Sequence, residues 1–165
     1  MDIIGRRLFF SRRRESKGFD MAKALIVFAS RGGETKKIGE LIAEGIRLSG
    51  VEAVMVKVSD VKSETDLAGY DAYVFGSATY HGDMIKGMKT LLFMAEKADL
   101  AGKPGGAFGA FGWSGEAGDR IYDTMKNIFQ MDMAGETLRL KSSHLGGGIK
   151  MAQDYGKKIA EKLNS

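Results

Sequence analysis

Residues 24–38 read Ala-Leu-Ile-Val-Phe-Ala-Ser-Arg-Gly-Gly-Glu-Thr-Lys-Lys-Ile, an apolar run that breaks into small polar residues and then turns basic. The run Ala24–Ala29 is continuously apolar, which is typical of a strand covered on both faces by helices. Apolar residues at helical spacing follow it, from Ile38 to Ile46. The stretch therefore predicts a buried strand, a turn over residues 30–35 and a helix that begins near Lys36.

The same alternation of strand and helix continues along the chain. Further strands are expected at Ala53–Val58, Ala72–Phe75, Ala107–Phe111 and Thr137–Leu140, with amphipathic helices between them. Strands joined through helices imply right-handed crossovers and a parallel sheet. The second and fifth strands each contain a charged residue, as strands near a sheet edge can. The sequence thus predicts an α/β three-layer sandwich around a five-stranded parallel sheet of order 2-1-3-4-5.

Composition excludes several classes of protein. The 165 residues are 44% hydrophobic and 28% charged, the balance of a globular domain. The longest apolar runs have about half a dozen residues, whereas ~20 are needed to cross a bilayer, so we expect no membrane span and a cytoplasmic protein. The chain has no cysteine and only two histidines, His81 and His144. Thiolate sites, iron–sulfur clusters and a histidine-rich metal centre are therefore excluded.

The excess of positive charge lies at the N-terminus. Residues 1–20 contain six basic and three acidic residues, which leaves +19 against −18 for residues 21–165. We therefore expect residues 21–165 to be the folded domain, with no nucleic-acid partner. The extension is open to three interpretations: a basic arm, a targeting peptide or a mis-assigned start. The third is favoured, because Met21 directly precedes the first strand and the codons of Lys17-Gly18 would resemble a bacterial ribosome-binding site. A native extension is expected to be disordered.

The candidate binding site comprises the segments after the three central strands, because doubly wound sheets bind ligands beyond the carboxyl ends of their strands. In Ser30-Arg-Gly-Gly-Glu-Thr35, glycines, hydroxyls and helix-start amides suit a phosphate group, with an ordinary N-cap turn as the alternative. Gly76-Ser-Ala-Thr-Tyr-His-Gly-Asp83 adds small residues and an aromatic. Gly109-Ala-Phe-Gly-Trp-Ser-Gly-Glu-Ala117 contains the single tryptophan, which either covers something flat or caps the sheet edge. Together the loops predict a site for a planar heterocycle that carries a phosphate.

From Met21 on, the sequence resembles the flavodoxins. Ser30-Arg-Gly-Gly-Glu-Thr35 lies where flavodoxins have their phosphate loop. The segments 76–82 and 107–117 are most similar to the flavodoxin domain of flavodiiron proteins. The diiron domain of those proteins has no counterpart in this sequence. The resemblance implies the flavodoxin-like fold and non-covalent FMN. It also implies three groups of cofactor-binding residues: at the phosphate, Ser30, Arg31, Gly32, Gly33, Glu34 and Thr35; on one side of the isoalloxazine, Ala78, Thr79, Tyr80, His81 and Gly82; on the other side and at the pyrimidine edge, Ala110, Phe111, Gly112, Trp113, Gly115, Glu116 and Ala117.

The function that the resemblance implies is electron transfer between redox proteins, with no catalytic acid or base and no metal. A backbone carbonyl within Tyr80–Asp83 is expected to face N5 of the flavin. His81 is expected to be a solvated loop residue, with a proton-linked role near N5 as the alternative. FMN-dependent reduction of a quinone or similar small molecule is the alternative, because it would use the same loops. A response-regulator receiver is disfavoured, since Ser30-Arg31 and Gly76-Ser77 stand where it needs carboxylates. Two features depart from the family: Tyr80-His81-Gly82 replaces asparagines of the flavodiiron domains, and the neutral body differs from the acidic flavodoxins that dock on basic partners.

Overall fold

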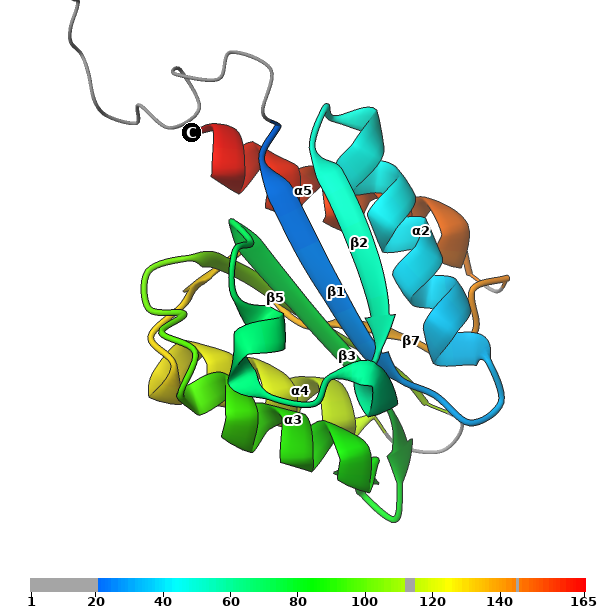
Figure 1. Cartoon of the computed structure of the whole chain (residues 1–165). Coiled ribbons are helices and arrows are strands. Elements are labelled where there is room, and N and C mark those ends of the chain that lie inside the picture. Colours follow the sequence, from blue (N-terminus) through cyan, green and yellow to red (C-terminus); the bar gives the residue numbers. More distant parts are fainter. Residues whose placement is uncertain (1–20, 112–114, 145) are drawn as a thin grey trace, which may run out of the picture.

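A parallel sheet runs through the centre of the protein between two layers of helices (Figure 1). The computed structural model describes residues 21–111, 115–144 and 146–165. The long strands are β1 (Lys23–Ala29), β2 (Glu52–Lys57), β3 (Ala72–Tyr80) and β5 (Pro104–Ala110). β1 pairs in parallel with both β2 and β3, and β3 pairs in parallel with β5. The predicted parallel α/β sheet is confirmed.

The predicted fifth strand forms as two short pieces at one edge of the sheet. β6 (Asp132–Met133) and β7 (Leu138–Leu140) both pair in parallel with β5. Between them Gly135 has a φ of 76°, a left-handed conformation that a strand does not contain. The order of the strands along the sheet is therefore the predicted 2-1-3-4-5, with its last member interrupted.

Two helices cover each face of the sheet (Figure 1). α2 (Glu34–Leu48) and α5 (Gly148–Asn164) lie on one face, and α3 (Lys86–Glu96) and α4 (Glu116–Asp123) lie on the other. α4 continues into a π-helical turn, η4 (Thr124–Ile128), and two 3₁₀ turns, η2 (Val58–Asp60) and η3 (Glu64–Leu67), follow β2. None of the helices in the described ranges is long and apolar enough to cross a bilayer.

The continuous apolar sequence of β1 serves two cores, because successive side chains of a strand point to opposite faces. Ile26 packs in the core under α2 and α5, whereas Leu25 and Val27 pack in the core under α3 and α4. All three are essentially inaccessible to solvent. A strand with polar residues on alternate positions could not occupy this central place, and this explains why the first strand carries the clearest signal in the sequence.

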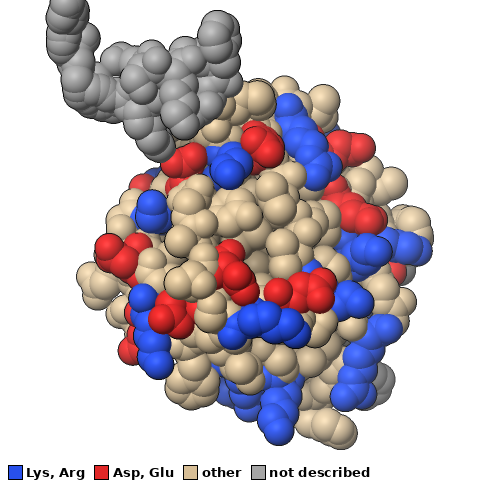
Figure 2. Space-filling model, in the orientation of Figure 1, with Lys and Arg blue, Asp and Glu red and all other residues tan. Residues whose placement is uncertain are grey.

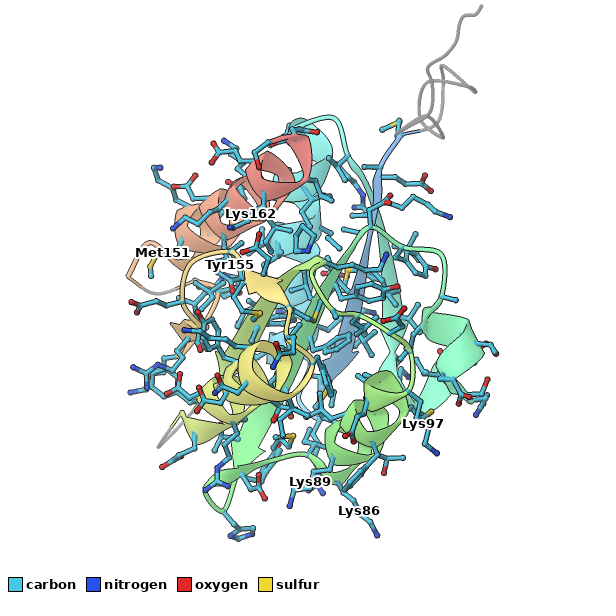
Figure 3. All side chains as sticks on the ribbon, turned by 90° about the vertical axis from the view of Figure 1, so that its left-hand side faces the viewer. Lys86, Lys89, Lys97, Met151, Tyr155 and Lys162 are labelled. Atoms are coloured by element: carbon cyan, nitrogen blue, oxygen red, sulfur yellow. The ribbon has the colours of Figure 1, made fainter. Side chains whose placement is uncertain are left out.

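α5 is held close to the sheet and to α2. The Tyr155 hydroxyl donates to the carbonyl of Ala107 at 3.1 Å and accepts from the amide of Ala107 at 3.0 Å, so this side chain joins α5 to the centre of β5 (Figure 3). A Cβ at Gly156 would lie 2.1 Å from the carbonyl oxygen of Ile42. The close approach of α2 and α5 therefore depends on glycine at this position.

β3 is longer than the sequence predicted, since it continues past Phe75 through Tyr80. At Gly76 a Cβ would lie within 2.4 Å of the ring of Phe108, its partner in the β3–β5 register, so the strand needs a glycine here. The predicted loop over residues 76–83 is thus mostly strand. It ends in a tight hairpin to β4 (Asp83–Met84), in which both turn residues, His81 and Gly82, have positive φ angles of 51° and 74°.

Candidate functional site

A hollow of about 610 Å³ lies at the carboxyl ends of the central strands. Its walls come from residues 30–35, 78–81 and 110–111, three segments that are distant in the sequence, and from Lys141, which directly follows β7. A concave, largely apolar surface with a few converging polar groups is typical of a small-molecule site. The structure therefore brings the three predicted loops together at one edge of the sheet.

The first segment is a shaped turn at the start of α2. Gly33 has a φ of 90° and precedes the helix, which begins at Glu34, two residues before the predicted start. The Ser30 hydroxyl oxygen accepts a 3.0 Å hydrogen bond from the Gly33 amide, and this closes the turn. The first amides of an α-helix have no acceptor within the helix and carry the positive end of its dipole. This turn thus presents donors and positive potential to the hollow.

Thr35 contributes a hydroxyl group that lacks a protein partner. The residue lines the hollow and is only 1% exposed, and Oγ1 makes no hydrogen bond to any residue that the structure describes. A buried polar group without a partner costs about 1–3 kcal/mol. A ligand oxygen in the hollow would remove this cost. The hydroxyl is therefore direct structural support for a polar ligand at the start of α2.

Glu34 ties the first segment to the loop before α5. Its Oε2 accepts a 2.6 Å hydrogen bond from the backbone amide of Ser143. This bond lowers the pKa of the Glu34 carboxyl below its ordinary value. The Ser143 hydroxyl is itself buried and without a hydrogen-bond partner among the described residues.

The sequence analysis missed both Lys141 and Ser143. The one available signal was that these residues follow the last strand at its carboxyl end.

Arg31 and Tyr80 contact one another at the hollow. The Arg31 guanidinium carbon lies 4.7 Å from the centroid of the Tyr80 ring, within the range of a cation–π interaction. Both side chains line the hollow, and Tyr80 remains 39% exposed. The contact links the turn after β1 to the end of β3. An aromatic ring and a permanent positive charge are thus available to a planar anionic ligand.

The wall formed by β3 is fixed by two hydroxyl groups. The Ser77 hydroxyl accepts a 2.9 Å hydrogen bond from the Ile85 amide and donates to the Ala78 carbonyl at 2.8 Å. The Thr79 hydroxyl accepts a 3.1 Å hydrogen bond from the Ala117 amide at the start of α4. These bonds hold the hairpin and the start of α4 in place. They also mean that the Ala117 amide is already engaged within the protein.

The predicted site residues divide into three groups. Eleven line the hollow: Ser30, Arg31, Gly32, Glu34, Thr35, Ala78, Thr79, Tyr80, His81, Ala110 and Phe111. Five others do not line it: Gly33, Gly82, Gly115, Glu116 and Ala117. Gly112 and Trp113 lie outside the described residues.

A family profile described as "Flavodoxin domain" matches residues 25–153. The chain belongs to the flavodoxin family. FMN is the cofactor of this family. A solved structure titled "Structure of a flavodoxin from the domain Archaea" superposes on this flavodoxin with a TM-score of 0.80 at 30% identity, covering 87% of this chain and 99% of that one. The predicted family and fold are confirmed.

Curated relatives of this flavodoxin are longer proteins. The "Putative diflavin flavoprotein A 3" of Synechocystis is 30% identical over 145 residues, which are 84% of this chain and 24% of the relative. The "Type A flavoprotein fprA" of Rhodobacter capsulatus is 28% identical over 166 residues, which are 96% of this chain and 37% of the relative. The chain thus spans 24% and 37% of the length of these two relatives.

Proposed function

We propose that this flavodoxin binds FMN in the 610 Å³ hollow and transfers electrons between redox proteins. The observation that carries the proposal is the Thr35 hydroxyl, which is buried, lacks a partner among the described residues and belongs to a residue that lines the hollow at the start of α2. A phosphate at a helix N-terminus is held by unpaired amides and by the helix dipole. The residues present therefore fit the phosphate of FMN.

The phosphate is assigned to the turn at residues 30–35. The first amides of α2 and the Thr35 hydroxyl would donate to it, while Ser30 keeps the turn closed through the Gly33 amide. Arg31 and Lys141, which both line the hollow, supply positive charge. Glu34 is the single carboxylate among the described lining residues, and its bond to the Ser143 amide holds one of its oxygens on the loop before α5.

The isoalloxazine is assigned to the ends of β3 and β5. Ala78 and Thr79 form a wall of small residues, Tyr80 adds an aromatic ring, and Ala110 and Phe111 form the other side. Stacking of Trp113 on the ring is retained as a proposal from the sequence, since this residue lies outside the described ranges. The hairpin at His81 and Gly82 is proposed to place a backbone carbonyl near N5.

Bound FMN supplies the redox chemistry, accepting and releasing electrons one or two at a time. The protein's residues bind the phosphate, orient the ring and limit its contact with water. Within the described ranges, no three or more His, Asp or Glu side chains form a group that could hold a metal ion. We propose that the lining residues bind and position the cofactor.

The test is a redox experiment on the protein reconstituted with FMN. We expect flavin absorption bands at a stoichiometry of one FMN per chain. We also expect rapid reoxidation of the reduced protein by an oxidised electron-transfer protein, and no sustained turnover with NAD(P)H and a quinone. Sustained NAD(P)H-dependent quinone turnover would support the alternative, an FMN-dependent reductase. Absence of flavin binding would contradict the proposal altogether.

A further inference from the structure

A small apolar hollow of about 300 Å³ lies between α3 and the turn η4. Leu92 and Phe129 are its buried lining residues, and Phe93 and Ile128 line it while they remain 73% and 58% exposed. Among the large hydrophobic side chains that the structure describes, Phe93 is the most exposed. An exposed apolar surface with a polar border typically marks a site of protein association.

Two residues of opposite charge border this hollow. Lys89 and Glu96 are the charged members of its described lining, and both are exposed. They lie four residues before and three residues after Phe93, so all three share one face of α3, with Lys89 on its first turn (Figure 3). Asp83 forms an ion pair with Lys89, whose ammonium group has three donors and can accept a second carboxylate. Glu96 forms no ion pair with another described residue.

The order of these residues makes the face complementary to itself. In a dimer with two-fold symmetry, each contact occurs twice with the roles of the two copies exchanged. If two α3 helices lie antiparallel across an axis between Leu92 and Phe93, Lys89 of each copy faces Glu96 of the other. The same symmetry places Leu92 opposite Phe93. A parallel pair of helices would instead bring like charges together, so the antiparallel arrangement is favoured.

The charge of the whole protein permits two copies to associate. The chain has a formal net charge of +4, and residues 21–165 are close to neutral. Figure 2 shows basic and acidic side chains interspersed over one face of the protein. Because a small net charge gives little repulsion between copies, the orientation of a dimer depends on local contacts such as those of α3.

The other exposed apolar side chains offer no comparable face within the described residues. Leu48 is 67% exposed at the end of α2 and lines neither this hollow nor the proposed FMN site. Ile149 and Met151 are exposed on α5, but residues two apart on a helix do not face the same way. Phe93 and Ile128, in contrast, line one hollow together.

We propose that the protein forms a dimer with two-fold symmetry through α3 and η4. Phe93 of each copy enters the hollow of the other, and Lys89 pairs with Glu96 at both ends of the contact. One helix and one turn from each copy make a small interface, so the association is weak and reversible. None of the described residues of this hollow lines the proposed FMN site, and the inference therefore does not depend on FMN.

The first test is sedimentation equilibrium of the full chain. We expect an average mass close to one chain at about 5 µM and approaching two chains at about 500 µM. Phe93→Ser should raise the dissociation constant of the dimer about ten-fold or more, because the apolar side chain is lost from both halves of the contact. Leu48→Ser is the matched control, since it removes a similarly exposed side chain elsewhere, and should stay within about two-fold of the parent.

The second test examines the antiparallel arrangement. Lys89→Glu and Glu96→Lys should each weaken self-association about five-fold or more, because each variant brings like charges together at both ends. An equimolar mixture of the two variants restores opposite charges at both ends and should associate about as tightly as the parent. Lys157→Glu and Glu161→Lys make the same charge changes at exposed positions of α5 and are the control pair. Each control variant should self-associate like the parent, with no gain on mixing.

The possible outcomes are distinct. A parent protein that stays monomeric at about 500 µM would overturn the proposal and leave this face to a different protein. Equal effects of Phe93→Ser and Leu48→Ser would show that another surface associates and would also overturn it. Failure of the mixture to associate more tightly than its components would contradict the antiparallel contact that defines the interface. Failure of the parent to bind FMN would overturn the proposed function and leave this inference intact.

Discussion

The carboxylate of Glu34 accepts a 2.6 Å hydrogen bond from the backbone amide of Ser143, 109 residues away in the chain. The bond joins the turn after β1 to the loop that precedes α5, and so connects the first and last loops at this end of the sheet. It also lowers the pKa of Glu34, because the amide stabilises the ionised carboxylate.

This bond predicts a contribution of Glu34 to stability that depends on pH. A carboxyl whose pKa is lowered by folding stabilises the protein above its ordinary pKa of 4.5, and this stability is lost as the pH falls through the lowered value. In Glu34→Gln, the free energy of unfolding in urea should therefore fall less between pH 7 and pH ~3.5 than in the parent. Exposed Glu161 provides the control as Glu161→Gln. An unchanged pH dependence in Glu34→Gln would show that the bond contributes nothing.

The basic residues around the start of α2 should strengthen FMN binding. Arg31, Lys36 and Lys37 are exposed near the positive end of the helix dipole, where cations are favourable only beside an anion. Changing all three to Gln should weaken FMN affinity and flatten its dependence on salt, measured by quenching of flavin fluorescence. The reduced flavin is anionic, so the potential of the second electron should become more negative. Retention of affinity, salt dependence and potential together would mean that backbone and hydroxyl groups alone hold the phosphate.

Tyr155→Phe tests the attachment of α5 to the sheet. The hydroxyl bonds both the carbonyl and the amide of Ala107, and burial raises the pKa of Tyr155 well above its ordinary value. Removal of the hydroxyl leaves both buried backbone groups without this partner and should cost about 1–3 kcal/mol of unfolding free energy. Tyr122→Phe is the matched control, because it removes a single exposed 2.8 Å bond to the carbonyl of Gly135 and should cost less. Equal costs for the two variants would contradict this account.

Much of the fold could be predicted because the central strands are buried on both faces. The apolar run Ala24–Ala29 has no polar interruption, and the structure shows why: its side chains enter both cores. Other boundaries could not be read from the sequence. β3 continues to Tyr80 through small residues that carry little strand signal, and Gly76 is needed there only because it faces the ring of Phe108. That pairing becomes visible only in three dimensions.

The candidate site, too, could be predicted where its residues are adjacent in the sequence and not where folding brings them together. The turn at residues 30–35 could be predicted, because a strand, glycines, hydroxyls and a helix start follow one another directly in the chain. Lys141 and Ser143 were missed, since their place beside this turn depends on the last crossover.

The most direct measurement of the central claim compares FMN with riboflavin, which lacks the phosphate, in the parent protein and in Thr35→Val. Valine has the shape of threonine without the hydroxyl, and a hydrogen bond to a charged group contributes about 1.5–3 kcal/mol. We predict that Thr35→Val weakens FMN binding about ten-fold or more in a fluorescence titration, leaves riboflavin binding unchanged and does not lower the free energy of unfolding of the apoprotein. Equal FMN affinity in the two proteins, or an equal loss for FMN and riboflavin, would contradict a phosphate site at the start of α2.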